Sequence, residues 1–213
     1  MEIIHNNLIY ISEEMGIALR NSAFSSNIKE RMDHSCAIFD EKGRMLAQAE
    51  HIPVHLGSMP QVVKEVLKIY PRDELSKGDV IIVNDPYSGG THLPDITFVT
   101  PIFYRGEIVS FAVNRAHHSD IGGKTPGSIP VDAESIYEEG LVIPPVKLVN
   151  RGKVNSDILK IILANTRTPK IRKGDIYAQL AANNVGAKRV IELIDKCSIY
   201  EFRKSRYKTA KTR

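Results

Sequence analysis

The sequence predicts an α+β fold with a central, mainly antiparallel sheet, flanking helices and a C-terminal helical segment. Three observations lead to this class: strand-like segments are concentrated in the middle of the chain, short glycine turns join several of them, and helical patterns occupy both ends. The 213 residues, 42% hydrophobic and 25% charged, are enough for one domain with a substantial core. We therefore expect one domain over residues 1–196, followed by a tail over residues 197–213.

Apolar residues at helical spacing predict the helices near both ends of the chain. Leu8, Ile11 and Met15 recur every three or four positions in the first of them. Ser58 followed by Pro60 predicts the start of the second, because proline is favoured in the first turn of a helix. The expected helices cover residues 6–22, 58–70, 156–166 and 174–196.

Short apolar or alternating segments with glycine turns between them predict the strands. The expected strands cover residues 35–40, 44–50, 79–84, 95–104 and 107–115. The first two flank a turn at Gly43, and the last two flank Arg105-Gly106, so both pairs are expected to be β-hairpins. A further tight turn is expected at Arg151-Gly152.

Two polar loops lie at the ends of the second hairpin, and the hairpin brings them together. The loops are NDPYSGGTHLPD at residues 84–95 and HHSDIGGKTPGSIP at residues 117–130. A turn of two residues pairs position 104 with 107, and a turn of three pairs it with 108. Either register places Asp95 beside positions 116 and 117, with cross-strand Cβ atoms about 5 Å apart.

His92, Asp95 and His117 are therefore candidate ligands of one divalent metal ion, with zinc, manganese and iron as the expected metals. Two imidazoles and one carboxylate suit these ions and leave coordination positions open for water or substrate. A register slip of one residue would replace His117 by His118. Asp120 is near enough to be a further ligand or to support a ligand.

Two other interpretations of the loops stay open. Their polar groups can serve only to satisfy backbone amides, with the glycine pairs present for turns. A phosphate cradle is the second interpretation, but the chain has neither G-x-x-x-x-G-K-[ST] nor G-x-G-x-x-G, so nucleotide binding by this chain is not expected.

The remaining polar candidates are expected to be structural. His51 and His55 flank Pro53, which favours an extended segment or a turn, and lining of the same cleft is the alternative for them. Arg31 and Asp33 are expected to form a local ion pair.

The two cysteines predict a reducing environment. Cys36 and Cys197 are far apart in the sequence and lack metal-ligand spacing, so no disulfide framework is expected and Cys36 is expected in the core. The start of the chain carries acidic residues and no long apolar segment. We therefore expect a cytoplasmic location and no membrane partner.

Charge is concentrated at the C-terminus. The last sixteen residues hold six Lys or Arg and one Glu, and the rest of the chain is close to neutral despite the overall net charge of +4. We expect residues 197–213 to form a basic tail without regular structure, with binding of RNA or a partner as the alternative interpretation. Nucleic acid is not the expected partner of the domain.

Several long motifs, in order, resemble the hydantoinase B family. This family includes the B subunit of N-methylhydantoinases, the C-terminal part of 5-oxoprolinase, and the alpha subunits of acetone and acetophenone carboxylases. The resemblance covers residues 28–195, and its segments are ERMDHSCAIFDEKGRMLAQAEHIPVHLGSMP, GDVIIVNDPYSGGTHLPDITFVTPIF, NRAHHSDIGGKTPGSIP, EGLVIPPVKL and GDIYAQLAANNVGAKRVIELI.

The resemblance implies one half of an ATP-dependent enzyme. A hydantoinase A-type partner would bind ATP and activate a carbonyl group by phosphorylation, and the B component would open a cyclic amide or carboxylate a ketone. It also implies a divalent metal held by a His-x-x-Asp pair and a distant histidine. That pattern falls on His92, Asp95 and His117.

Three functions follow as expectations. The first is the metal-binding B-type component of an ATP-dependent cyclic amide hydrolase of the N-methylhydantoin or 5-oxoproline type. The others are a component of a ketone carboxylase and a non-catalytic assembly fragment. Family members are more than twice as long, so we expect a truncated product, a split subunit or a degenerate copy, joined to the rest of a B-type polypeptide or self-associated.

Overall fold

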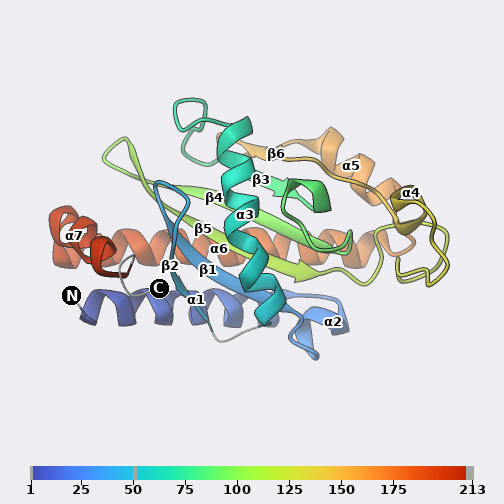
Figure 1. The fold of residues 1–213 in the computed structure, drawn as a ribbon, viewed down its shortest axis with the longest axis horizontal. Helices are drawn as coiled ribbons and strands as arrows, with labels where there is room; N and C mark the ends of the chain where they lie inside the picture. The colour runs from blue at the N-terminus through green and yellow to red at the C-terminus, as the bar shows by residue number, and fades with distance from the viewer. Residues whose placement is uncertain (1, 50–51, 210–213) are drawn as a thin grey trace.

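The computed structural model describes residues 2–49 and 52–209 and shows one sheet with helices on both faces (Figure 1). The strands are β1 (His34–Asp40), β2 (Met45–Gln48), β3 (Val80–Val83), β4 (Asp95–Tyr104), β5 (Glu107–His117), β6 (Val146–Asn150) and β7 (Lys153–Val154). The helices are α1 (Glu2–Ser22), α2 (Ser26–Lys29), α3 (Pro53–Ile69), α4 (Ile136–Glu139), α5 (Ser156–Ala164), α6 (Pro169–Cys197), α7 (Ile199–Thr209) and the 3-10 helix η1 (Pro86–Ser88).

The strands form a seven-stranded antiparallel sheet in the order β2-β1-β5-β4-β3-β6-β7, which confirms the predicted fold class. Side chains alternate between its faces. In β1, Ala37 and Phe39 pack with α3, and Cys36 and Ile38 pack with α1 and α6 on the opposite face. Figure 1 shows α3 in front of the sheet and α6 behind it. Cys36 is fully buried in this core, as predicted.

The β4–β5 hairpin contains both registers that its sequence allows. Arg105 and Gly106 have φ values of 51° and 88°, as a tight two-residue hairpin turn requires, and Tyr104 pairs with Glu107. The register shifts by one residue between Ile102 and Phe103. From this bulge to the end of the hairpin, the pairing is that of the longer turn.

Three helices begin earlier than predicted, and the first of them, α1, begins at Glu2 and not at residue 6. The second helix begins at Pro53, not at Ser58, and Pro60 lies inside it. Both prolines are acceptable in a first turn, and no local signal in the sequence favours the earlier one over the later one. The extended conformation predicted around Pro53 is therefore wrong for His55, while His51 lies outside the described residues.

The third boundary that differs is that of the long C-terminal helix. α6 begins at Pro169, not at Gly174, so the predicted break after Thr168 is its N-terminus. The tail predicted without regular structure is also partly helical, because residues 199–209 form α7 and the side chain of Phe202 is fully buried. None of the described helices has the length and apolar character needed to span a bilayer.

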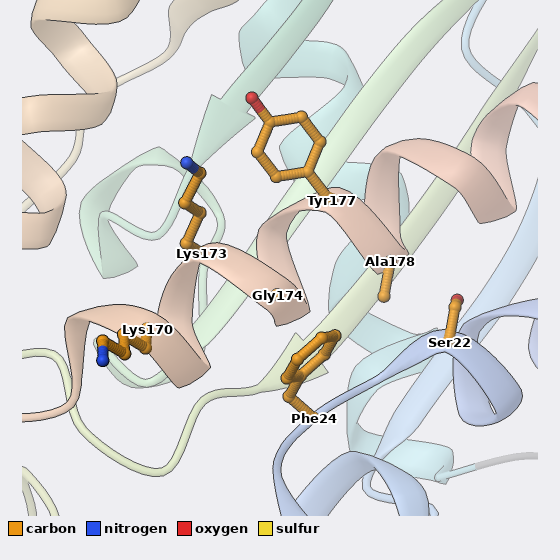
Figure 2. Close-up of a pocket in the computed structure, with 7 residues that line it drawn as sticks. All are labelled: Ser22, Phe24, Lys170, Lys173, Gly174, Tyr177 and Ala178. Carbon is orange, nitrogen blue, oxygen red and sulfur yellow. The ribbon is translucent and has the colours of Figure 1, made fainter.

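α6 is fixed against the N-terminal helices by one buried carboxylate and by two glycines. Asp175 accepts hydrogen bonds from the backbone N–H groups of Phe24 and Ser25, at 2.8 and 3.0 Å, in the segment between α1 and α2. Its other partner is the Arg172 guanidinium, 2.9 Å away, and both side chains are fully buried. Figure 2 shows the Phe24 ring beside Gly174, at a surface pocket of about 370 Å³.

The two glycines of α6 provide a matched test of this packing. A methyl group on Gly174 would meet the ring of Phe24, which is 68% exposed, and one on Gly186 would meet the sulfur of fully buried Met15. Alanine gains about 1 kcal/mol of helix propensity at either position. The Phe24 ring can rotate into solvent, whereas Met15 is confined, and overpacking of a core costs about 1–3 kcal/mol.

We therefore expect Gly186→Ala to be about 1–3 kcal/mol less stable than Gly174→Ala in urea unfolding. Equal stability of the two variants would contradict this account of the interface between α1 and α6.

Candidate metal centre

Five polar side chains from separate parts of the chain meet at one end of the sheet. β4 begins at Asp95 and β5 ends at His117, and these two residues are direct cross-strand partners. His92 comes from the loop between η1 and β4, His55 from the first turn of α3, and Asp33 from the residue before β1. The predicted convergence of His92, Asp95 and His117 is present.

The distances join these three residues into one cluster. His92 Nε2 lies 3.0 Å from His117 Nδ1, and His117 Nδ1 lies 3.1 Å from Asp95 Oδ1. His92 Nδ1 lies 3.2 Å from Asp95 Oδ2. One donor atom from each residue falls within a 4.8 Å span.

Asp95 is the centre of the cluster. Its carboxylate is fully buried and contacts three imidazoles, the third being His55, whose Nε2 lies 3.2 Å from Oδ2. The Thr91 hydroxyl also donates to Oδ2. Burial alone would raise the pKa of Asp95, but hydrogen bonds from His117, His55 and His92 outweigh it and hold that pKa far below its usual range. Asp95 is therefore a carboxylate, ready to act as an anionic ligand.

The carboxylate in turn affects the exposed histidine. Its hydrogen bond to His92 raises the pKa of that imidazole, against the effect of partial burial. The side chain of His92 is 42% exposed, whereas that of His117 is 11% exposed. The cluster thus opens to solvent on the side of His92.

The alternative interpretation of His55, that it lines the same cleft, is confirmed, whereas Asp33 was not predicted as a site residue. His55 is buried, and its Nδ1 lies 3.3 Å from the Ser35 hydroxyl, which fixes the ring with Nε2 toward Asp95. Within the described part of the chain, Asp33 has ion-pair contacts with His55 at 3.7 Å and His117 at 4.0 Å, and not with Arg31. The helix that carries His55 begins two residues earlier, at Pro53.

The bulge decides between His117 and His118. Because the register shifts once, His117 faces Asp95 and His118 lies on the opposite side of the sheet. There, His118 Nε2 lies 2.8 Å from the Gln179 side-chain oxygen on α6. Complete burial and the nearby charge of Arg172 hold the pKa of His118 well below its usual range, so it is a neutral, structural histidine.

Asp120 neither joins the cluster nor supports it. Its carboxylate accepts backbone hydrogen bonds from Gly122, Gly127 and Arg167, and the Arg167 guanidinium lies 3.0 Å from Oδ2. Burial opposes the charged form, but these donors outweigh it and lower the pKa of Asp120. Asp120 therefore closes its own loop onto the segment that precedes α6.

The loop that carries His92 is fixed by its own backbone. Asp85 caps η1 through the N–H of Tyr87 at 2.9 Å, and Gly89 has a φ of 86°. A side chain on Gly90 would meet the carbonyl oxygens of Asn84 and Asp85. The predicted role of the glycine pair in the turn is confirmed, and Asn84-Asp85-Pro86 follow the end of β3 at Val83, as predicted.

Arg115 is a buried cation close to the cluster. It lies two residues before His117 on the same face of β5, and its Nε donates to Thr97 Oγ1 at 2.7 Å. Its Nη1 donates to the Ser58 hydroxyl on α3, one turn after His55. Burial lowers the pKa of Arg115 to about 10, although the charge of Asp95 opposes this effect. Arg115 thus holds α3 to β4 beside the cluster.

The chemistry of the three donors and two of their separations fit a divalent metal ion. Ligands about 2.0–2.2 Å from one ion lie about 3.0–3.5 Å apart at octahedral or tetrahedral angles. The separations of 3.0 Å between His92 and His117 and 3.1 Å between His117 and Asp95 match this range. Imidazole and carboxylate ligands suit zinc, manganese and iron.

The family of the chain is decided by a match over nearly all of its length. The profile of the family described as Hydantoinase B/oxoprolinase matches residues 1–210. The chain belongs to this family. The match runs through α7, so the resemblance does not stop near residue 195 as expected.

Curated relatives of this hydantoinase B chain share between a third and a half of its residues. An uncharacterized protein of Methanocaldococcus jannaschii is 52% identical, and the match covers 92% of this chain and 35% of that protein. The 5-oxoprolinase 1 of Arabidopsis thaliana is 40% identical, with 92% and 16% covered. The beta subunit of caprolactamase from Pseudomonas jessenii is 37% identical, with 95% and 35% covered. The chain thus spans about a third or less of the length of these relatives.

Two solved structures share the fold. The crystal structure of ATP-dependent caprolactamase from Pseudomonas jessenii superposes with a TM-score of 0.91 at 37% identity, over 97% of this chain and 36% of that chain. The nucleotide-free structure of acetone carboxylase superposes with a TM-score of 0.89 at 21% identity, over 97% and 28%. The second comparison shows a common fold alone.

The structural role of Asp120 gives a pH-dependent prediction. A carboxyl group whose pKa is lowered by folding stabilises the protein above its unfolded pKa of about 3.9, and the contribution is lost as the pH falls through the folded pKa. Asp120→Asn should therefore cost about 1–3 kcal/mol at pH 7, because several hydrogen bonds to a charged acceptor are weakened.

The cost should shrink as the pH is lowered below about 4, where the wild-type carboxyl group is itself protonated. Urea unfolding at a series of pH values measures it. A cost that does not vary with pH would show that the charge of Asp120 is not what its partners stabilise.

Proposed function

We propose that this chain is the metal-binding part of the B-type component of an ATP-dependent cyclic amide hydrolase. It would work with a hydantoinase A-type partner that binds ATP and activates the amide carbonyl by phosphorylation. The observation that carries the proposal is the cluster of His92, Asp95 and His117, with donor atoms at ligand-to-ligand distances. The names of the relatives, which include 5-oxoprolinase and caprolactamase, support the substrate class.

Each residue of the cluster has a distinct task in this proposal. His92, Asp95 and His117 would hold the ion, and a bound divalent cation would polarise a carbonyl oxygen or lower the pKa of a water molecule. His55 would keep Asp95 in place from behind through their 3.2 Å contact. Exposed His92 would mark the side from which the activated amide approaches.

The hydrolase interpretation is favoured over the carboxylase interpretation by sequence identity. The 5-oxoprolinase and caprolactamase relatives are 37–40% identical to this chain. Acetone carboxylase is 21% identical in the aligned structure, which supports the fold and not the reaction. The caprolactamase relative is named as a beta subunit, which supports assembly with another polypeptide.

Metal content tests the first step of the proposal. The wild-type chain, loaded with Mn²⁺ or Zn²⁺ and desalted, should retain about one ion per chain in elemental analysis. His92→Ala and His117→Ala each remove one of three protein ligands, so titration calorimetry should show at least a 10-fold loss of affinity. Asp120→Asn is the matched control, because its carboxylate is bound to backbone amides and Arg167.

The control should bind metal like the wild type. A wild-type chain without metal after loading, or a His92→Ala variant with full affinity, would show that the cluster is not a metal site.

Coupled turnover tests the reaction class. The chain is mixed with a hydantoinase A-type protein from the same source, with ATP, and with 5-oxoproline, hydantoin or caprolactam in separate assays. We expect phosphate release that requires one of these amides and gives the ring-opened acid. Acetone with bicarbonate serves as the control for carboxylation.

Turnover that depends on the ketone and bicarbonate would replace the hydrolase proposal by the carboxylase one. No ATP turnover with any substrate, together with normal metal binding, would favour an assembly fragment that needs further B-type polypeptide.

A further inference from the structure

α1 exposes a line of three large apolar side chains. Ile3, Tyr10 and Ile17 are 75%, 65% and 59% exposed. They are seven residues apart, which is almost two helical turns, so they lie along one stripe about 21 Å long. Figure 1 shows α1 at the lower edge of the molecule, with α6 on its inner side.

The other face of the same helix is already used by the core. The buried apolar residues of α1 are Ile4, Leu8, Ile11, Met15 and Leu19. One helix thus carries a broad apolar face and a second, narrow apolar row, and only the broad face is covered by the residues that the structure describes. Single exposed apolar side chains are ordinary, but three of them at seven-residue spacing along one helix, with polar residues between them, follow the spacing by which paired helices contact each other.

The order of residues in the stripe is the same in both directions. Ile3 and Ile17 are each seven positions from Tyr10, so the row reads isoleucine, tyrosine, isoleucine from either end. A two-fold axis perpendicular to the helix at Tyr10 would place each tyrosine against its own copy. It would also place Ile3 against Ile17 of the second copy, which is the self-complementary contact that a symmetric dimer needs.

The polar residues beside the stripe favour the same antiparallel pairing. Around the two-fold axis at Tyr10, Glu2 comes near Arg20 of the second copy, and Asn6 comes near Glu13 of the second copy. A parallel pairing would set each Glu13 against its own copy, and like charges across an interface are unfavourable. Glu14, on the other flank, is already paired with Arg189 at 2.5 Å.

We propose that α1 is a self-association surface, on which two copies of this chain pack antiparallel about a two-fold axis at Tyr10. A single helix pair buries less than the about 1,200 Å² of standard protein interfaces, so the dimer belongs to the weak, reversible class. This inference is independent of the metal cluster, because α1 lies on the opposite face of the sheet from α3, which carries His55.

Oligomeric state over a range of concentrations tests the proposal. Sedimentation velocity of the full chain from about 1 to 500 µM should show a reversible shift from monomer to dimer. Tyr10→Glu, which sets two carboxylates against each other at the axis, should keep the chain monomeric at the highest concentration. Tyr137→Glu is the matched control, because Tyr137 is 82% exposed on α4 and lies outside the stripe.

Far-UV circular dichroism of both variants checks that α1 remains folded. A wild-type chain that is monomeric throughout, or a dimer that Tyr10→Glu does not weaken, overturns the proposal. A third outcome is a chain that stays monomeric and binds a different polypeptide, with that binding weakened by Tyr10→Glu. This result would also overturn self-association and would identify the surface as the binding site of that polypeptide.

Disulfide trapping tests the orientation of the helices. In a Cys197→Ser background, which leaves only buried Cys36, Tyr10→Cys should give a covalent dimer under mild oxidation. Glu13→Cys is the control, because an antiparallel pair separates the two copies of this position by about 9 Å along the helix axis. Efficient trapping of Glu13→Cys and not of Tyr10→Cys would overturn the two-fold axis at Tyr10.

Discussion

A buried carboxylate is stable only if hydrogen-bond donors or cations surround it. At this end of the sheet, the arrangement of the surrounding segments supplies such donors to Asp95. Three imidazoles and the Thr91 hydroxyl surround it, and they come from α3, from the loop before β4 and from the end of β5. None of these segments can move far without leaving a buried charge unpaired. The carboxylate therefore links the placement of the helix, the loop and the hairpin to one another, whatever ion the cluster binds.

The two faces of the sheet support this end in different ways. On the face of α6, buried amides replace apolar packing: Gln179 donates to the Ile96 carbonyl and Asn183 to the Phe98 carbonyl, at 2.9 and 3.2 Å. These bonds fix the backbone of β4 just after Asp95. On the other face, Arg115 joins β4 to α3, which sets the position of His55. The cluster thus lies between two helices that are both tied to β4. α6 is hydrogen-bonded to the backbone of β4, and α3 is joined to the Thr97 side chain of β4 through Arg115.

The sequence was enough to predict the hairpin and the meeting of its polar ends, because strand alternation and the Arg105-Gly106 turn are local signals. It could not decide between His117 and His118, since the bulge that sets the register has no distinctive residue. Asp33 was missed, and for His55 the cleft was only the alternative to a structural role, because only tertiary packing brings these two residues to the cluster. The helix α7 was missed because its composition is that of a solvated segment, and contact with the core overrides that local preference.

The bulge between Ile102 and Phe103 has a consequence for the tolerated lengths of this hairpin. Hairpin tips at the surface usually accept insertions and deletions, since nothing beyond the tip depends on them. Here, the number of residues between Asp95 and His117 decides which histidine faces the carboxylate. Loss of one residue from a strand would turn every side chain between the deletion and the cluster to the opposite face of the sheet. Selection for the cluster is thus also selection on the number of residues in the hairpin, its exposed tip included.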